Sequence, residues 1–389
     1  MPQTSAERAV PRSLFITNDF PPRIGGAQSW FWGLINTLDP ADVVVLAPAH
    51  RDAAAFDATH PYRVVRAASS VLWPTPALVR KAAALIEEHE LELVQLGHPL
   101  PAGLMGPALR KRTGRPYMIF LGGAEVTLPA KIPVVGSLLR YVLRRAALLV
   151  STSEYTATKA RRQTRGKAPV QVSRPALDLA AFALREPGDA DAAKAAFGID
   201  GPLVVCVGRL VPRKGQDKLL DALTPLSAEF PDLHLALVGS GRLARRLRAR
   251  ARRRGLDGRV HLPGAVSGDE LHRWLVAADV FASPCRSRWG GLEVEGYGLV
   301  FAEASLVGVP VVGGDSGGAP EFVKNGETGI LVDGRSVNEV ARALAELLRL
   351  SPAERLRRAL AGRELALSYH DPALVAERYR RVLDRAVGR

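Results

Sequence analysis

Short apolar runs alternate with longer segments of helical spacing along most of the chain. Runs of three to five apolar residues between turn residues indicate buried strands, whereas a period near 3.6 indicates helices. The predicted strands of the first half are residues 13–17, 43–46, 63–65, 93–96, 117–121, 148–151 and 170–172. Those of the second half are residues 203–207, 234–238, 260–262, 280–282 and 309–312. Strand-helix alternation of this kind predicts an α/β fold with parallel sheets covered on both faces.

Prolines and a change in composition interrupt the alternation at residues 175–188. A chain of 389 residues is also longer than the chains that usually fold around a single hydrophobic core. We therefore predict two doubly wound, Rossmann-like domains that face each other across a cleft, residues 1–178 and 183–371. The last segment, residues 372–389, has a helical pattern and is predicted to return to the first domain.

Composition and charge narrow the class of protein. Apolar residues make up 47% of the chain and charged residues 24%, as in ordinary globular proteins. The net charge of +14 favours anionic partners such as phosphorylated small molecules, acidic membrane surfaces or nucleic acid. Cys206 and Cys285 lie far apart and are expected to be free buried thiols. With no signal-peptide or membrane-span pattern in the sequence, we expect a cytoplasmic protein.

The stretch from Glu293 to Glu321 has the features of a phosphate-binding turn. Glu295 and Glu303 stand eight residues apart, with Gly298 between them and an apolar, helix-compatible run after it. The first N–H groups of a helix that begins near Leu299 would be available to an anion, and the glycines would allow it to approach closely. An ordinary strand-to-helix turn with capping acids would have the same local sequence.

Arg209 and Lys214 follow the first predicted strand of the second domain, in the sequence VGRLVPRKGQD. Two cations in one loop can bind a diphosphate and stabilise the charge that it gains on leaving. Two unrelated surface cations near a turn are the structural alternative. Gly25 and Gly26 stand at a comparable strand-to-helix turn near the start of the chain.

Several motifs occur in order at wide spacing: TNDFPPRIGG at 17–26, PTP at 74–76, LVPRKGQD at 210–217, GSG at 239–241, GLEVEGYGLVFAEA at 291–304 and GGAPE at 317–321. Together they resemble the retaining GT-B glycosyltransferases of family 4. The likeness is strongest to the actinobacterial mannosyltransferases that build phosphatidylinositol mannosides. It covers nearly the whole chain.

The resemblance implies a set of donor-binding residues. Arg209 and Lys214 would bind the diphosphate, Glu303 the nucleotide ribose and Glu295 the hydroxyls of the donor sugar, with Arg209, Lys214 and Glu295 as the catalytic set. Further contacts to the donor are implied for the backbone of Gly25, Gly26, Gly298, Leu299 and Val300 and for the loop near Val266. Asp19 would face the acceptor.

The same resemblance implies a nucleotide-sugar substrate, with GDP-mannose favoured, and no metal or other cofactor. The only D-x-D sequence, Asp189-Ala190-Asp191, lies at a predicted helix start, where acidic residues favour the helix dipole. We interpret these acids as helix-capping or solvated residues, not as a metal site.

The chain departs from the family pattern in two places. Gly122 stands where related enzymes have a histidine near the donor sugar, and Ala176 replaces a glycine in the hinge motif. His98, in a loop after a different strand, could substitute for the missing imidazole, or it could be an ordinary loop histidine.

Our leading hypothesis is transfer of mannose from GDP-mannose to a lipid-linked acceptor such as a phosphatidylinositol mannoside. The alternatives are a different donor or acceptor, suggested by Gly122, or a nucleotide-sugar binder without transfer activity. The exact donor, acceptor, linkage and oligomeric state are left open by the sequence.

Two basic segments suggest further surfaces. A helix from about Ser137 within the segment ending at Val150 would gather Arg140, Arg144, Arg145 and Tyr141 on one side and Leu138, Leu139, Val142 and Leu143 on the other. This pattern fits peripheral contact with the anionic inner face of the cell membrane, or packing on the protein's own domain.

The second segment, residues 242–254, carries an arginine-rich face around an apolar stripe of Leu243, Leu247 and Ala251. We interpret it as the solvated face of a helix. Binding of nucleic acid is disfavoured because no aromatic platform accompanies it.

Overall fold

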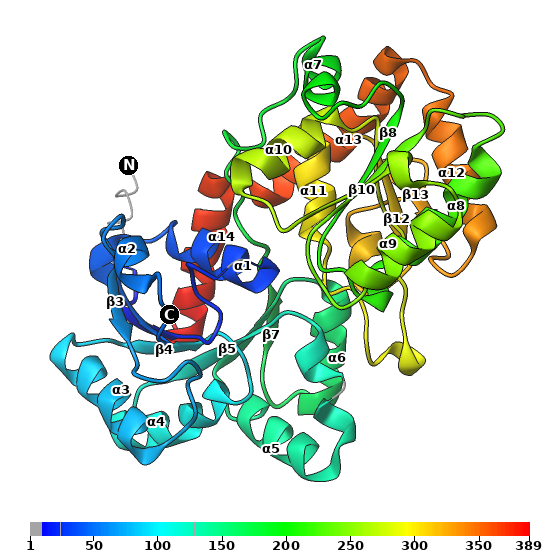
Figure 1. The fold of residues 1–389 in the computed structure, drawn as a ribbon. Coiled ribbons are helices and arrows are strands. Elements are labelled where there is room, and N and C mark those ends of the chain that lie inside the picture. The colour runs from blue at the N-terminus through cyan, green and yellow to red at the C-terminus, as the bar shows by residue number, and fades with distance from the viewer. Residues whose placement is uncertain (1–9, 24, 128) are drawn as a thin grey trace, which may run out of the picture. The chain divides into compact units, whose positions relative to one another are not determined.

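The computed structural model describes residues 10–23, 25–127 and 129–389, which divide into two compact units (Figure 1). Unit 1 holds the chain as far as Ala176 together with Pro372–Arg389, and unit 2 is Leu177–Asp371. The division falls beside the prolines at which the alternation of strands and helices is interrupted. Residues 1–9 of the N-terminal segment that lacks a signal-peptide pattern lie outside the described residues.

Unit 1 is built on a parallel sheet of seven described strands in the order β3-β2-β1-β4-β5-β6-β7. The strands are β1 (Ser13–Ile16), β2 (Val43–Ala47), β3 (Arg63–Arg66), β4 (Leu93–Leu96), β5 (Tyr117–Leu121), β6 (Leu148–Ser151) and β7 (Val170–Val172). Its helices are α1 (Gly26–Ile35), α2 (Ala53–Asp57), α3 (Pro76–Glu88), α4 (Met105–Thr113), α5 (Pro133–Leu143), α6 (Glu154–Thr164) and α14 (Pro372–Val387).

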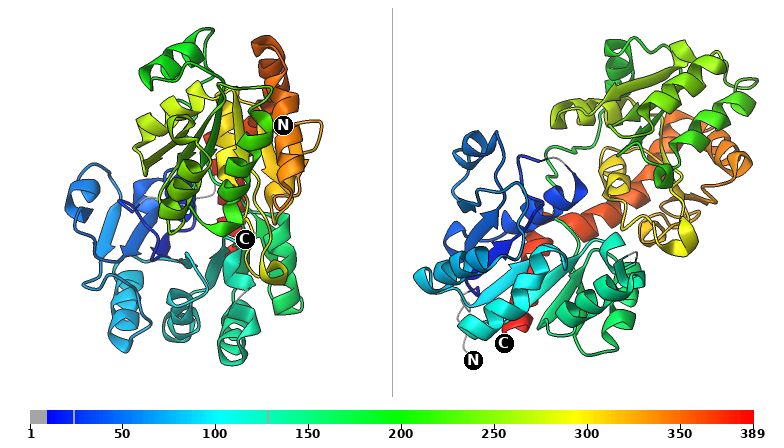
Figure 2. Two further views of the ribbon diagram at one scale, coloured as in Figure 1. Left: turned by 45° about the vertical axis from the view of Figure 1, so that its right-hand side comes forward. Right: turned by 60° about the horizontal axis from the view of Figure 1, so that its bottom comes forward.

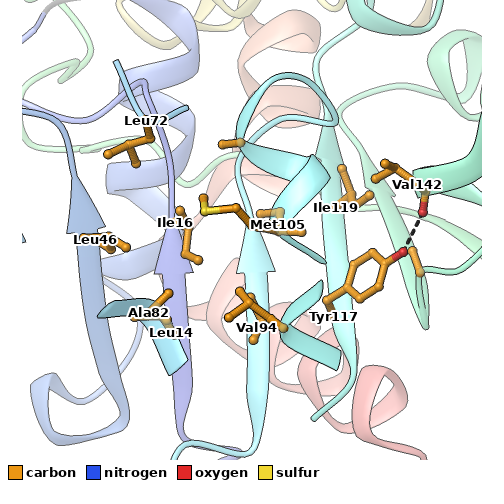
Figure 3. Close-up of a cluster of buried hydrophobic side chains, with 14 of the residues drawn as sticks. Leu14, Ile16, Leu46, Leu72, Ala82, Val94, Met105, Tyr117, Ile119 and Val142 are labelled. Atoms are coloured by element: carbon orange, nitrogen blue, oxygen red, sulfur yellow. Dashed lines mark hydrogen bonds between the residues drawn. The ribbon is translucent and has the colours of Figure 1, made fainter. Parts of the chain in front are cut away.

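Alternating side chains of the central strands supply two apolar layers, one on each face of the sheet. Leu14, Ile16 and Val94 belong to the layer that α3, α4 and α5 cover (Figure 3). Phe15 and Val45, which point to the opposite face, pack with α1 and α14. Burial on both faces explains why these strands are continuously apolar.

Unit 2 repeats the plan with six described strands in the order β10-β9-β8-β11-β12-β13. The strands are β8 (Leu203–Val207), β9 (His234–Val238), β10 (Val260–Gly264), β11 (Val280–Ser283), β12 (Val311–Gly314) and β13 (Gly329–Val332). Its helices are α7 (Asp189–Ala196), α8 (Gln216–Leu226), α9 (Ala244–Arg253), α10 (Gly268–Ala277), α11 (Leu299–Leu306), α12 (Val337–Leu348) and α13 (Pro352–His370). The predicted α/β fold of two Rossmann-like sheets is confirmed, although the four-residue strand β13 is absent from the prediction.

Local features of unit 2 bear on the sequence interpretation. The N-cap of α7 is Gly188, and no side chain caps the helix. Asp189 and Asp191 lie in the first turn of α7, where the Asp189 carboxylate accepts the backbone N–H of Glu186 at 2.7 Å. On α9, Leu247 and Ala251 are buried. Both cysteines are free and buried.

The α5 segment corrects one prediction. The helix begins at Pro133, a favoured first helical residue, and ends at Leu143, so Arg144 and Arg145 follow it and residues 148–151 form β6. Leu138 is not on the packed side with Leu139. It shares the i, i+4, i+7 face of Val134 and Tyr141, and all three are exposed.

The C-terminal helix α14 lies on the sheet of unit 1 (Figure 2). Its Tyr379 hydroxyl donates to Oε1 of Gln95 on β4, and Nε2 of Gln95 donates to the Ser13 hydroxyl on β1 at 2.8 Å. All three residues are buried, so the two bonds join the helix to the centre of the sheet.

Tyr379→Phe is expected to lower the free energy of unfolding by about 1–3 kcal/mol, because it leaves the buried Gln95 oxygen without a donor. The measurement is urea denaturation followed by circular dichroism. Tyr141→Phe is the matched control, since that ring is exposed and its change should stay within about 0.5 kcal/mol. Equal midpoints for the two variants would contradict the assigned bond.

Candidate functional site

The strand order of unit 2 reverses between β8 and β11, which are neighbours in the sheet. In parallel α/β sheets, ligands bind outside the carboxyl ends of the strands at such a switch point. Arg209 and Lys214 follow β8, and Glu295 lies in the loop that follows β11. The topology therefore brings two separate predicted motifs to one edge of the sheet.

A buried ion cluster forms at this edge. Lys214 Nζ lies 2.9 Å from Glu295 Oε2, and the Arg213 guanidinium donates to the same oxygen at 2.8 Å. Burial opposes ionisation of Glu295, but the Lys214 and Arg213 charges hold its pKa below the usual range. The carboxylate is thus ionised at neutral pH, and it keeps acceptor lone pairs on Oε1.

Helix α11 begins beside this cluster. Gly298 is its N-cap, with φ of 85°, and a Cβ there would lie 2.6 Å from the Phe301 ring, so the turn requires glycine. Leu299 and Val300 are the first helical residues, whose N–H groups stand at the positive end of the helix dipole. The predicted start of this helix near Leu299 is correct.

Glu303 lies on the second turn of α11 and is half-buried. Burial raises the pKa of its carboxyl to about 7, against the opposing charge of Lys214. The two glutamates of the motif therefore differ: Glu295 is held ionised, whereas Glu303 changes charge near neutral pH.

Close backbone packing supports the cluster. The N–H of Gly318 donates to the Glu295 carbonyl at 3.0 Å, and a Cβ on Gly317 would lie only 1.8 Å from that carbonyl oxygen. A Cβ on Gly239 would likewise come within 2.2 Å of the Gly208 carbonyl oxygen. The GGAPE and GSG motifs thus permit neighbouring loops to pack directly on the site.

The remaining residues predicted in unit 2 are placed as follows. Arg209 is exposed, and its positive charge also helps to lower the pKa of Glu295. Val266 follows β10, two strands away from β8, and is half-buried against the apolar core. Arg213 was not predicted as a site residue. Its place beside Lys214 in the sequence PRKG is the signal that could have identified it.

Unit 1 has its own switch point, between β1 and β4. Asp19 follows β1, and its carboxylate accepts Gln28 Nε2 at 2.7 Å and lies 2.6 Å from His98 Nε2. His98 is therefore not a solvated loop residue. Gly25 is the N-cap of α1 and Gly26 its first residue, on the helix that follows β1.

Glu125, in the turn after β5, is a polar residue at this edge that sequence analysis did not single out. Its Oε1 lies 3.3 Å from His98 Nδ1. A Cβ at Gly122 would lie 3.2 Å from the same Glu125 oxygen, so the missing side chain at 122 and the imidazole of His98 meet at one carboxylate.

Comparison with known proteins identifies the family. Residues 24–181 match the family model described as Glycosyltransferase Family 4, and residues 189–364 match that of Glycosyl transferases group 1. The chain is 38% identical over 359 residues to a GDP-mannose-dependent alpha-(1-6)-phosphatidylinositol monomannoside mannosyltransferase of Mycolicibacterium smegmatis, covering 91% of this chain and 93% of that one. A Corynebacterium glutamicum mannosyltransferase named for the monoacylated form of that acceptor is 37% identical over 90% of this chain and 92% of its own.

Solved structures share the fold at lower identity. Anabaena HepE, solved with UDP and glucose, superposes with a TM-score of 0.81 and 21% identity over 96% of this chain and 99% of its own. Sucrose-phosphate synthase from Thermosynechococcus elongatus gives a TM-score of 0.78 at 21% identity, covering 95% of this chain and 98% of its own. With the motifs, the two sheets and the extended identity in agreement, this chain belongs to glycosyltransferase family 4.

Proposed function

We propose that the protein is a hexosyltransferase that moves mannose from GDP-mannose to a phosphatidylinositol mannoside, with retention of the anomeric configuration. The observation that carries the proposal is the Lys214, Arg213 and Glu295 cluster beside the start of α11, in a chain 38% identical to an enzyme of that specificity. Both relatives named above are transferases, which lends no support to a nucleotide-sugar binder without activity.

Each group in unit 2 has a distinct proposed task. The departing GDP gains negative charge, and Arg209, Lys214 and the α11 N–H groups of Leu299 and Val300 stabilise it. These fixed positive groups do the work that a metal ion does in other transferases, so we propose no metal requirement. Removing one such donor from a preorganised site typically costs about 10²–10³ in rate.

The two glutamates are assigned to hydroxyl groups. Glu295, ionised and held by Lys214 and Arg213, accepts hydrogen bonds from the donor sugar, and Glu303 accepts them from the ribose. Val266 is assigned to the base and Asp19 to the acceptor. Gly25 and Gly26 are assigned to the donor phosphates through the backbone at the start of α1.

Arg209→Ala and Lys214→Ala are each expected to lower kcat/KM by about 10²–10³ while the fold is retained. The measurement is GDP release from GDP-mannose with and without acceptor. Arg245→Ala is the matched control, because Arg245 is an exposed arginine on α9. A wild-type protein that neither binds nor turns over any GDP- or UDP-sugar would refute the proposal.

The pKa of Glu303 predicts how donor affinity depends on pH. Burial raises this pKa to about 7, and only the ionised carboxylate is a pure acceptor for ribose hydroxyls. Affinity for GDP is therefore expected to increase as the pH rises from about 6 to 8, as the site ionises. Glu303→Gln should flatten this dependence in calorimetric titrations, whereas Glu346→Gln, in an exposed ion pair with Arg358, should keep it.

We further propose that the protein works at the inner face of the cell membrane through an apolar patch on unit 1. The patch consists of Ile132, Val134, Leu138 and Tyr141, whose exposed fractions are 48%, 71%, 44% and 46%. A shallow hollow lined by Pro133, Val134, Ser137, Leu138 and Tyr141 lies there. Among the described residues, no helix is long and apolar enough to span a bilayer.

Basic side chains border the apolar patch. Lys131 and Arg145 are exposed, and the Arg145 guanidinium stacks 4.0 Å from the centre of the Tyr141 ring. Apolar side chains that insert shallowly, with cations in the headgroup layer, are the usual arrangement of a surface-bound helix. An anionic membrane surface fits this pattern, since each basic residue there contributes about 1 kcal/mol.

The double variant Val134→Ser, Leu138→Ser is expected to bind vesicles of phosphatidylinositol and phosphatidylcholine about ten-fold more weakly, because it removes two inserting side chains. The assay is co-sedimentation with vesicles. Leu360→Ser, at an exposed leucine of α13, is the control. Unchanged sedimentation of the double variant would exclude the apolar patch as the membrane contact.

A further inference from the structure

Three ionisable side chains from separate loops meet at the switch point of unit 1. His98 Nε2 lies 2.6 Å from Asp19 Oδ2, and its Nδ1 lies 3.3 Å from Glu125 Oε1. The three residues follow β1, β4 and β5, which are neighbours in the sheet. Ligands of α/β sheets bind at this position, so the Asp19, His98 and Glu125 cluster lies where a substrate is expected.

Close packing at the ends of these strands fixes the imidazole. A Cβ on Gly97 would lie 2.4 Å from Thr17 Oγ1, so only glycine lets the chain leaving β4 pass so near to the chain leaving β1. Gly103 packs against the His98 backbone, and a Cβ on Gly103 would lie 2.7 Å from the His98 carbonyl oxygen. The ring of Phe31 on α1 packs edge-on against the imidazole, with centroids 5.5 Å apart.

The cluster carries a net negative charge at neutral pH. Burial disfavours the imidazolium, but the hydrogen bond to Asp19 and the negative charges of Asp19 and Glu125 raise the pKa of His98 to about 9. The bond from His98 is in turn the main reason that the pKa of Asp19 is lowered, and the nearby Arg23 adds to it. Glu125 also has a lowered pKa, although burial opposes its ionisation. Two carboxylates thus share one imidazolium.

Two atoms of the cluster, His98 Nδ1 and Glu125 Oε2, have no hydrogen-bond partner among the described residues. Glu125 Oε2 is buried, and no described residue donates to it. Leaving a buried carboxylate oxygen unpaired is costly, and such atoms in native proteins usually await a ligand or water. Gly122 lies against this carboxylate, and a Cβ there would lie 3.8 Å from Oε2.

We propose that His98 is a positioning residue that holds Asp19 and Glu125 so that both carboxylates accept hydroxyl groups from the carbohydrate or cyclitol part of the acceptor. A carboxylate only accepts hydrogen bonds, and a polyol supplies donors without adding charge. The single imidazolium keeps two carboxylates ionised side by side, which their mutual repulsion would otherwise prevent. The proposal rests on the proposed glycosyltransferase function and adds His98 and Glu125 to its acceptor site.

The test separates acceptor binding from donor chemistry. The full chain is assayed with GDP-mannose and phosphatidylinositol monomannoside in detergent micelles, and donor hydrolysis is measured without acceptor. His98→Gln should raise the acceptor KM about ten- to one-hundred-fold, while the donor KM and donor hydrolysis stay within about two-fold of wild type. His89→Gln, at the end of α3 and before β4, is the matched control and should change none of these values.

A pH profile distinguishes positioning from a merely structural role. In wild type, the acceptor KM should rise above about pH 9 as His98 loses its proton, whereas His98→Gln should lack this limb. Glu125→Gln provides a second variant, in case His98→Gln does not fold, and should raise the acceptor KM with the donor KM unchanged.

The outcomes are distinguishable. Wild-type protein that releases no GDP would overturn the proposed function itself. Wild-type turnover with acceptor KM values unchanged in both His98→Gln and Glu125→Gln would overturn the acceptor-site roles of both residues but not the proposed function. An alkaline limb retained in His98→Gln would overturn the role of His98.

Discussion

The reversal of strand order within each parallel sheet is the constraint on which the sites depend. On either side of the reversal, neighbouring strands send their helices to opposite faces, so the loops at their carboxyl ends diverge and leave room for a ligand. In unit 2 this occurs between β8 and β11, and in unit 1 between β1 and β4. Residues as far apart in sequence as Lys214 and Glu295 thereby come within 2.9 Å.

The two switch points carry opposite charge patterns, and each pattern suits its proposed ligand. In unit 2, Lys214 and Arg213 outnumber the one carboxylate that they share, and the exposed Arg209 adds a third cation. In unit 1, two carboxylates share one imidazolium. An excess of cations fits a diphosphate, whereas two neighbouring carboxylates fit the hydroxyl groups of a neutral polyol. Lys214 and Glu295 are buried, so removing one of them leaves the other less well compensated, typically at a cost of about 3–5 kcal/mol.

The charged cluster of unit 1 bears on the glycine at position 122, where the family resemblance implies a histidine. The resemblance to the family implies only the loss of an imidazole after β5. The structure shows an imidazole delivered from the neighbouring strand β4 to the carboxylate that a side chain at 122 would approach.

The sequence by itself determined the fold class, the positions of nearly all strands, and the start of α11, because apolar period, prolines and glycines act locally. It also identified Arg209, Lys214, Glu295 and Glu303 as candidates through their motifs. Only the tertiary structure decided that Leu138 is exposed. It also decided the long-range contacts of the sites, such as Arg213 with Glu295 and His98 with Asp19. These contacts join residues up to 82 positions apart, as for Arg213 and Glu295. They depend on strand order and loop packing, which no local pattern encodes.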